Sequence, residues 1–161
     1  MRAILFKAKW KDNGKWVKGY VVCKHGLYFI YDIVNSDSCG QNIYEIDPET
    51  LCQFTGLYDK NGKRIWENDI LMCHGNPVDL VRATFGEFGV IDTETGTVVD
   101  EAIGWHYKVV PTDAISRCEP FCWPMPLTKE YIRCCEMEVV DNPELSQEDP
   151  DEQISISDGN T

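Results

Sequence analysis

Basic residues are scarce in this chain of 161 residues. Fifteen Lys and Arg oppose 27 Asp and Glu, which gives a formal net charge of −12. Because phosphate groups are bound by clustered cations, this balance argues against a general nucleic-acid binder unless the basic residues are segregated on one face. Only residues 1–24 approach such segregation, with seven Lys and Arg against the single Asp12.

Long apolar runs are also lacking. No stretch approaches the roughly 20 apolar residues that span a bilayer. The N-terminal segment regains charge at Lys7 and Lys9, too early for the apolar region of a signal peptide. We therefore expect a cytoplasmic protein with no membrane partner.

Catalytic and phosphate-binding motifs are absent from the sequence. His25, His74 and His106 give no triad with a Ser or Cys. The glycines of Gly86-Glu87-Phe88-Gly89 lack the following helix and lysine of a phosphate loop. We expect a protein that is not an enzyme and that has no cofactor.

Cysteine, in contrast, is unusually abundant, with eight residues in the chain. A disulfide framework requires an oxidising compartment, and a zinc site would draw on Cys118, Cys122 and the adjacent Cys134 and Cys135, at spacings unlike the usual knuckles. We favour reduced thiols that act as small core residues, as at Cys23. Cys73 is interpreted in the same way, and no metal site is expected.

Short β-like runs separated by turn residues predict a mainly β fold. Residues 1–51 read as an N-terminal β-meander. The segment CQFTGLYDKNGKRIWENDILM at residues 52–72 predicts a hairpin, because Asn61-Gly62 accepts the positive φ of a tight turn. Five short runs within residues 69–110, separated at Gly86-Glu87 and at other turn residues, favour an SH3-like barrel.

The C-terminal third is harder to assign. Short helical pieces are expected there, although periodicity leaves residues 128–137 open between helix and strand. Residues 146–161 are acidic and nearly without aliphatic residues, which predicts a disordered tail.

The hairpin segment also carries a family resemblance. Together with FGEFGV at residues 85–90 and EVVDNPEL at residues 138–145, it resembles the YopX family of bacteriophage and prophage proteins over residues 2–145. Asn68 stands where that family commonly carries glycine. The matching motif residues are Gln53, Thr55, Gly56, Leu57, Asp59, Asn61, Gly62, Ile65, Glu67, Asp69 and Ile70.

The resemblance implies a small all-β phage or prophage protein of the bacterial cytoplasm, without an assigned activity. Homo-oligomers are one expectation, and no catalytic residue is transferred. We divide the chain into an N-terminal meander (1–51), a YopX-like core (52–145) with the barrel at about 69–110, and the acidic tail (146–161).

The motif carboxylates Asp59, Glu67 and Asp69 have two interpretations. Neighbouring carboxylates can perform acid–base chemistry or hold a divalent metal. Such side chains also cap turns by accepting backbone amides. We interpret these three, and the rest of the motif, as structural.

A second candidate site is aromatic. Trp105, Tyr107, Phe121 and Trp123 form the densest aromatic region, beside a run with three prolines. Core packing is the simpler interpretation, and a patch that binds a partner is the alternative, because aromatic residues anchor interfaces.

Two functions follow from these observations. The first is a non-enzymatic protein-binding module that acts on a host or phage protein, with its acidic surface and acidic tail directed at a basic target. The second is a small-barrel nucleic-acid binder that uses the N-terminal lysines with Trp10, Trp16 and Tyr20.

Overall fold

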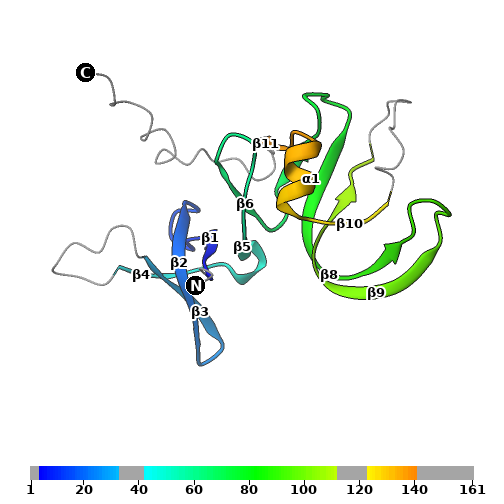
Figure 1. Cartoon of the computed structure of the whole chain (residues 1–161). Coiled ribbons are helices and arrows are strands. Elements are labelled where there is room, and N and C mark those ends of the chain that lie inside the picture. Colours follow the sequence, from blue (N-terminus) through cyan, green and yellow to red (C-terminus); the bar gives the residue numbers. More distant parts are fainter. Residues whose placement is uncertain (1–3, 33–41, 112–122, 141–161) are drawn as a thin grey trace, which may run out of the picture.

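A computed structural model describes residues 4–32, 42–111 and 123–140 of the chain. These residues form two antiparallel sheets and one short α-helix (Figure 1). The predicted mainly β class is confirmed. The acidic tail and Phe121 lie outside the described residues.

The first sheet has six strands in the order β4-β3-β2-β1-β5-β6. The consecutive pairing of β1, β2 and β3 confirms the predicted meander, and the β5–β6 hairpin extends the same sheet. The division of the chain at residue 51 stays a prediction. The strands are β1 (Phe6–Lys9), β2 (Trp16–Lys24), β3 (Leu27–Asp32), β4 (Ile43–Glu45), β5 (Cys52–Tyr58) and β6 (Arg64–Trp66).

One face of this sheet builds a small core. Ala8, Ile30 and Ile46 are fully buried there. A 3₁₀ helix, η1 (Pro48–Thr50), follows β4, and the Asp47 side chain caps it by accepting the Glu49 amide at 3.1 Å. Side chains of alternate residues face opposite sides of a strand, so the other face of β1 and β2 carries mainly Lys and aromatic residues, together with the exposed Val22.

The second sheet has five strands in the order β10-β9-β8-β7-β11. The helix α1 (Lys129–Cys134) begins at Thr128, whose hydroxyl accepts the Tyr131 amide at 3.1 Å. Within residues 128–137, which the sequence left open between helix and strand, residues 129–134 thus form a helix, and a strand follows at Glu138. The strands are β7 (Ile70–Met72), β8 (Leu80–Ile91), β9 (Val98–Val109), β10 (Met125–Pro126) and β11 (Glu138–Val140).

The sequence expectation of separate short strands between residues 78 and 110 is wrong for β8 and β9. Each is one continuous strand of 12 residues. Gly86 and Gly104 lie directly opposite each other in the β8–β9 register, so both strands bend at one level and the pairing continues. The long ribbon curves away from the sheet in Figure 1. Closure of an SH3-like barrel stays a prediction.

The largest core lies between the second sheet and α1. It includes Leu71, Val81 and Tyr107 from the strands, Ile132 from α1, and Met137 before β11. Within residues 4–32, 42–111 and 123–140, no helix is long and apolar enough to cross a membrane.

Candidate functional site

The turn between β5 and β6 is organised by the buried carboxylate of Asp59, which is 6% exposed. Its Oδ1 accepts the amides of Asn61 at 2.8 Å and Lys63 at 2.9 Å, and its Oδ2 accepts the Val139 amide at 2.9 Å. Gly62 in the same turn has a φ of 83°. The carboxylate oxygens are therefore used as acceptors for three backbone amides.

The other two motif carboxylates also accept backbone amides. Asp69 Oδ2 accepts the Trp66 amide at 2.8 Å, and Oδ1 lies 3.4 Å from Nζ of Lys7. Glu67 accepts the Gln53 amide at 3.2 Å. Burial raises the pKa of Asp69, and the neighbouring Lys7 ammonium acts in the opposite direction. These contacts give the carboxylates structural roles around the β5–β6 hairpin and just before β7.

The remaining motif residues shape the hairpin and its packing. Thr55 Oγ1 donates to the carbonyl of Ile65 at 2.8 Å and accepts the Leu57 amide at 3.1 Å. Gly56 has a φ of 84° where the β5–β6 pairing is irregular. The segment also contains Asn61, which is exposed, and Ile65 and Ile70, which are buried.

Metal-binding chemistry finds no support in the part of the chain that the structure describes. No group of three or more His, Cys, Asp or Glu side chains there is arranged to hold a metal ion. The five described cysteines are free thiols. Cys73 is buried, whereas Cys23 is exposed near the end of β2, beyond the core, so its interpretation as a core residue was wrong.

The aromatic residues singled out in the sequence do not share one environment. Tyr107 is 1% exposed and belongs to the main core. Trp105 is half-buried beside that core. Trp123 packs over the turn between β8 and β9, since a methyl group placed on Gly96 would lie 3.3 Å from its ring. Phe121 lies outside the described residues.

A different surface stands out in the structure. Residues 85–104, the outer part of the β8–β9 ribbon, form what we call the β8–β9 arm (Figure 1). Five large apolar side chains of this arm are exposed to solvent. They are Phe85 (52%), Val90 (36%), Val98 (62%), Val99 (62%) and Ile103 (70%).

The arm is joined to the sheet by packed aromatic side chains. Phe85 packs edge-on against Trp105, with ring centroids 5.2 Å apart. Beyond the bend, Phe88 stacks on His106 at 4.7 Å with an interplanar angle of 24°. Since His106 is 1% exposed, this stack gives the inner part of the arm a fixed base.

Sequence reasoning missed the arm, although a compositional signal is present. Residues 83–107 contain five Asp and Glu and no Lys or Arg. Glycine interruptions were interpreted as strand ends, and this concealed the length of the ribbon. The sequence does not show which elements cover β8 and β9, so the exposure of the arm becomes visible only in the tertiary structure.

The comparisons with known proteins bear on the family. The family model described as YopX protein matches residues 5–119, which is most of the chain. The matched range contains the complete β5–β6 motif and the β8–β9 arm, and it ends before the segment 138–145 that the sequence comparison included. No curated protein matches this chain significantly. The chain therefore belongs to the YopX protein family.

Proposed function

We propose that this chain is a non-enzymatic protein-binding module whose β8–β9 arm binds a positively charged surface of another protein. The observation that carries the proposal is the exposure of Val98, Val99 and Ile103, each 62–70% exposed, on an acidic ribbon. YopX family membership suggests a phage-type protein of uncharacterised activity, and a host or phage protein is accordingly the proposed partner.

The apolar exposure extends to both faces of the arm. Phe85 and Ile103 lie on one face, because Phe85 pairs with Trp105, two residues from Ile103. Val90 is five residues from Phe85 on β8 and therefore points to the other face. Isolated two-stranded ribbons are marginally stable in water, so a ribbon with apolar side chains on both faces is stabilised by a partner that covers them.

The edges of the arm support the same function. Strand β7 pairs with β8 only at residues 80–82, and β10 pairs with β9 only at residues 106 and 107. The outer parts of β8 and β9 therefore offer backbone donors and acceptors along their edges. Exposed edges of this kind accept an added strand from a partner.

Charge indicates the chemistry of that partner. The five carboxylates within residues 83–107 have no basic residue among them. They attract a cationic surface at long range and repel an acidic one. The apolar side chains then supply the contact area, because desolvated apolar groups dominate the energy of an interface.

The proposal is tested first by site-specific photocrosslinking. A benzoylphenylalanine replaces Ile103 on the arm or, as a control, Lys129 on α1, and each variant is irradiated in cells of the natural host. We expect an adduct with a positively charged protein from position 103 only. Equal adducts from both positions, or an adduct with a second copy of the chain, would contradict the proposal.

The captured partner is then purified and its affinity measured. Ile103→Asp is expected to weaken binding about 30-fold, as at the centre of an interface, and higher salt is expected to weaken it further. Leu27→Asp is the matched control, because Leu27 is also exposed (44%) but lies at the β2–β3 turn. Equal losses for the two variants would argue against the arm.

A further inference from the structure

The six-stranded sheet presents a second surface, on the face opposite its small core. Lys7 pairs with Lys18 and Lys9 pairs with Trp16 in the β1–β2 register. Directly paired residues of neighbouring strands share a face, so these four side chains lie together. We call this surface the lysine–tryptophan face. It consists of Lys7, Lys9, Trp16, Lys18, Tyr20, Val22, Lys24 and Tyr31. Trp66, which is 3% exposed and belongs to a buried cluster, borders this face beside Lys7.

The lysines of this face are ordered by aromatic rings. Nζ of Lys7 lies 5.2 Å from the ring centroid of Trp16 and 5.3 Å from that of Trp66. Nζ of Lys9 lies 5.7 Å from the Trp16 centroid, and Nζ of Lys18 lies 6.0 Å from the Trp66 centroid. Cations within about 6 Å of a ring centroid are attracted to it. Ordered ammonium groups lose less conformational freedom when they bind an anion.

Tyrosines extend the face beyond the lysines. Tyr20 and Tyr31 pair directly across β2 and β3, so their side chains stand next to each other. Tyr20 is 53% exposed. Lys24 continues the same face of β2 at the outer end of the strand and is also exposed. A row of cations thus adjoins a pair of aromatic rings.

The balance of charge on the face is positive. Among the described residues, the carboxylates on or beside it include Glu45, which pairs with Lys11, and Asp69, which pairs with Lys7, with Glu67 near the Asp69 end. Lys9 and Lys24 add positive charge over the rest of the face. The segregation that nucleic-acid binding requires is therefore present locally, within a chain of net charge −12.

We infer that the lysine–tryptophan face binds single-stranded nucleic acid. Sequence-tolerant single-strand binding combines cations that contact the phosphates with aromatic rings on which bases stack. Here the lysines supply the first element and the paired tyrosines the second. A duplex fits less well, because its bases are already stacked on each other and are not available to the rings.

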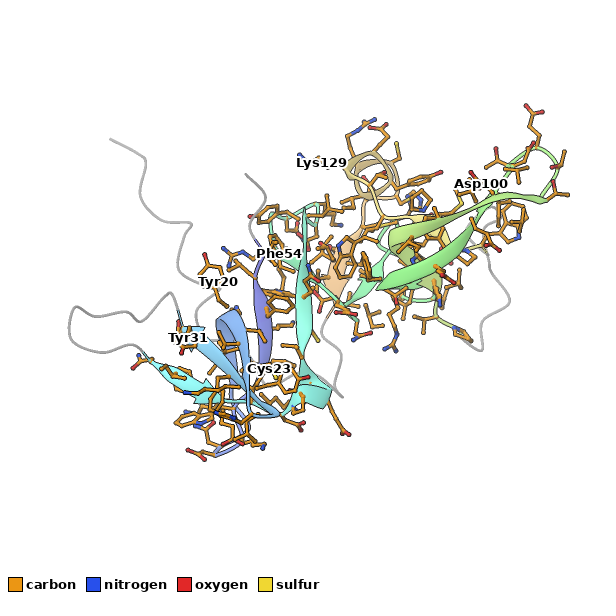
Figure 2. The ribbon with its side chains drawn as sticks, turned by 90° about the horizontal axis from the view of Figure 1, so that it is seen from below. Tyr20, Cys23, Tyr31, Phe54, Asp100 and Lys129 are labelled. Carbon is orange, nitrogen blue, oxygen red and sulfur yellow. The ribbon has the colours of Figure 1, made fainter. Side chains whose placement is uncertain are left out.

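The position of the face is compatible with binding at the arm. Tyr20 and Tyr31 lie at the opposite end of the molecule from Asp100 on the arm (Figure 2). The arm carboxylates are thus remote from phosphates bound at the sheet, and exposed charges farther apart than about 10 Å are largely screened at 0.1 M salt. The two surfaces serve different ligands, so this inference goes beyond the proposed protein-binding function.

The inference is tested by fluorescence anisotropy with labelled 20-nucleotide oligo(dT) and oligo(rU), and with a duplex of the same length. We expect saturable binding of at least one single strand at 20 mM salt. Three phosphate contacts would give a slope of about −2 in a plot of log K against log salt concentration. Tighter binding of oligo(dT) or of oligo(rU) shows whether the ligand is DNA or RNA, and either preference supports the inference.

Matched variants distinguish binding at the lysine–tryptophan face from an effect of the protein's total charge. Lys24→Glu is expected to weaken binding at least 10-fold, whereas Lys129→Glu on α1 makes the same charge change and is expected to leave affinity within about 2-fold. Tyr20→Ala is expected to weaken binding about 10-fold through lost stacking. Both Tyr20 and Lys24 are exposed, so these variants keep the core intact, which circular dichroism checks.

Four results would overturn the inference. They are no saturable binding at 20 mM salt, equal losses from Lys24→Glu and Lys129→Glu, duplex binding as tight as single-strand binding, and equal affinity for poly-glutamate. The arm variant Ile103→Asp is expected to bind oligonucleotide as the wild type does. Failure here would therefore be distinct from failure of the arm as a protein-binding surface.

Discussion

Asp59 and Val139 stand 80 positions apart in the chain, and Asp59 Oδ2 accepts the Val139 amide at 2.9 Å. The same carboxylate closes the β5–β6 turn through the amides of Asn61 and Lys63. Strand β11 pairs with β7 over only three residues. The turn of the first sheet is thus a second attachment point for a strand of the second sheet.

Removal of the Asp59 carboxylate should therefore destabilise the fold markedly. Asp59→Ala removes the acceptor of three part-buried backbone hydrogen bonds, and we expect a loss of about 3 kcal/mol in the free energy of unfolding. Asp59→Asn keeps one acceptor oxygen and should lose about 1 kcal/mol. Urea unfolding followed by tryptophan fluorescence measures both.

A matched control for Asp59 exists at the tip of the β8–β9 arm. Asp92 Oδ1 accepts the Glu94 and Thr95 amides in an exposed turn. Because water can satisfy those amides, Asp92→Ala should cost about 0.5 kcal/mol. A loss for Asp59→Ala no larger than this would contradict the role assigned to the buried carboxylate.

Asp69 should make stability depend on pH. Burial raises its pKa above the ordinary value of 3.8, despite the opposing effect of Lys7. The folded state then binds more protons than the unfolded state between 3.8 and the folded-state pKa. The contribution of Asp69 to the free energy of unfolding therefore decreases as the pH rises through that window and is constant above it.

The measurement compares the wild type with Asp69→Asn. Free energies of unfolding are determined for both proteins from pH 4 to 8. The wild-type value minus the variant value should decrease as pH rises through the window. A difference that increases with pH would mean that Lys7 lowers the pKa more than burial raises it.

Gly19 is expected to tolerate no side chain. A methyl group on Gly19 would lie 1.8 Å from the backbone oxygen of Tyr31, so the β2–β3 pair would have to move apart. We expect Gly19→Ala to cost about 3 kcal/mol, at the upper end of overpacking effects. Thermal unfolding and soluble yield measure this cost.

Gly104→Ala provides the comparison for Gly19→Ala. A methyl group there would have no neighbouring heavy atom within 4 Å. The change should shift stability by no more than about 0.5 kcal/mol. Similar losses at the two glycines would show that strand propensity, and not the close backbone approach at Gly19, sets the cost.

Thiol reactivity should separate Cys73 from Cys23. Burial raises the pKa of Cys73 to about 12, so about one molecule in 10,000 carries the thiolate at pH 8, and the thiolate is the reactive form. Cys23 is exposed. Iodoacetamide at pH 8, followed by peptide mass analysis, should label Cys23 rapidly and Cys73 only in urea. Equal rates in the folded protein would contradict the described burial.

The local features of the β5–β6 hairpin were accessible from the sequence because they depend on neighbouring residues. Asn61-Gly62 predicts the tight turn through the conformational freedom of Gly62, and an aspartate two residues before Asn61 predicts an amide acceptor. The contact from Asp59 to Val139 was not accessible. It joins segments that come together only when the two sheets pack.

The β8–β9 ribbon illustrates the opposite case. Gly86 and Gly104 each suggest the end of a strand when considered alone. Their direct opposition in the register allows one shared bend and a continuous ribbon. Register is a relationship between two distant segments, and no local pattern specifies it.

The amino-acid sequence by itself determined the mainly β class, the hairpin turn and the YopX resemblance, because alternation and turn chemistry act over a few residues. Only the tertiary structure decided which apolar residues are exposed and which charges are adjacent. Ile103 is exposed because no described helix or strand covers it, and Lys7 meets Trp66 because β1 lies beside the β5–β6 hairpin. Burial and charge clustering are properties of the packed chain, so both candidate surfaces emerge only there.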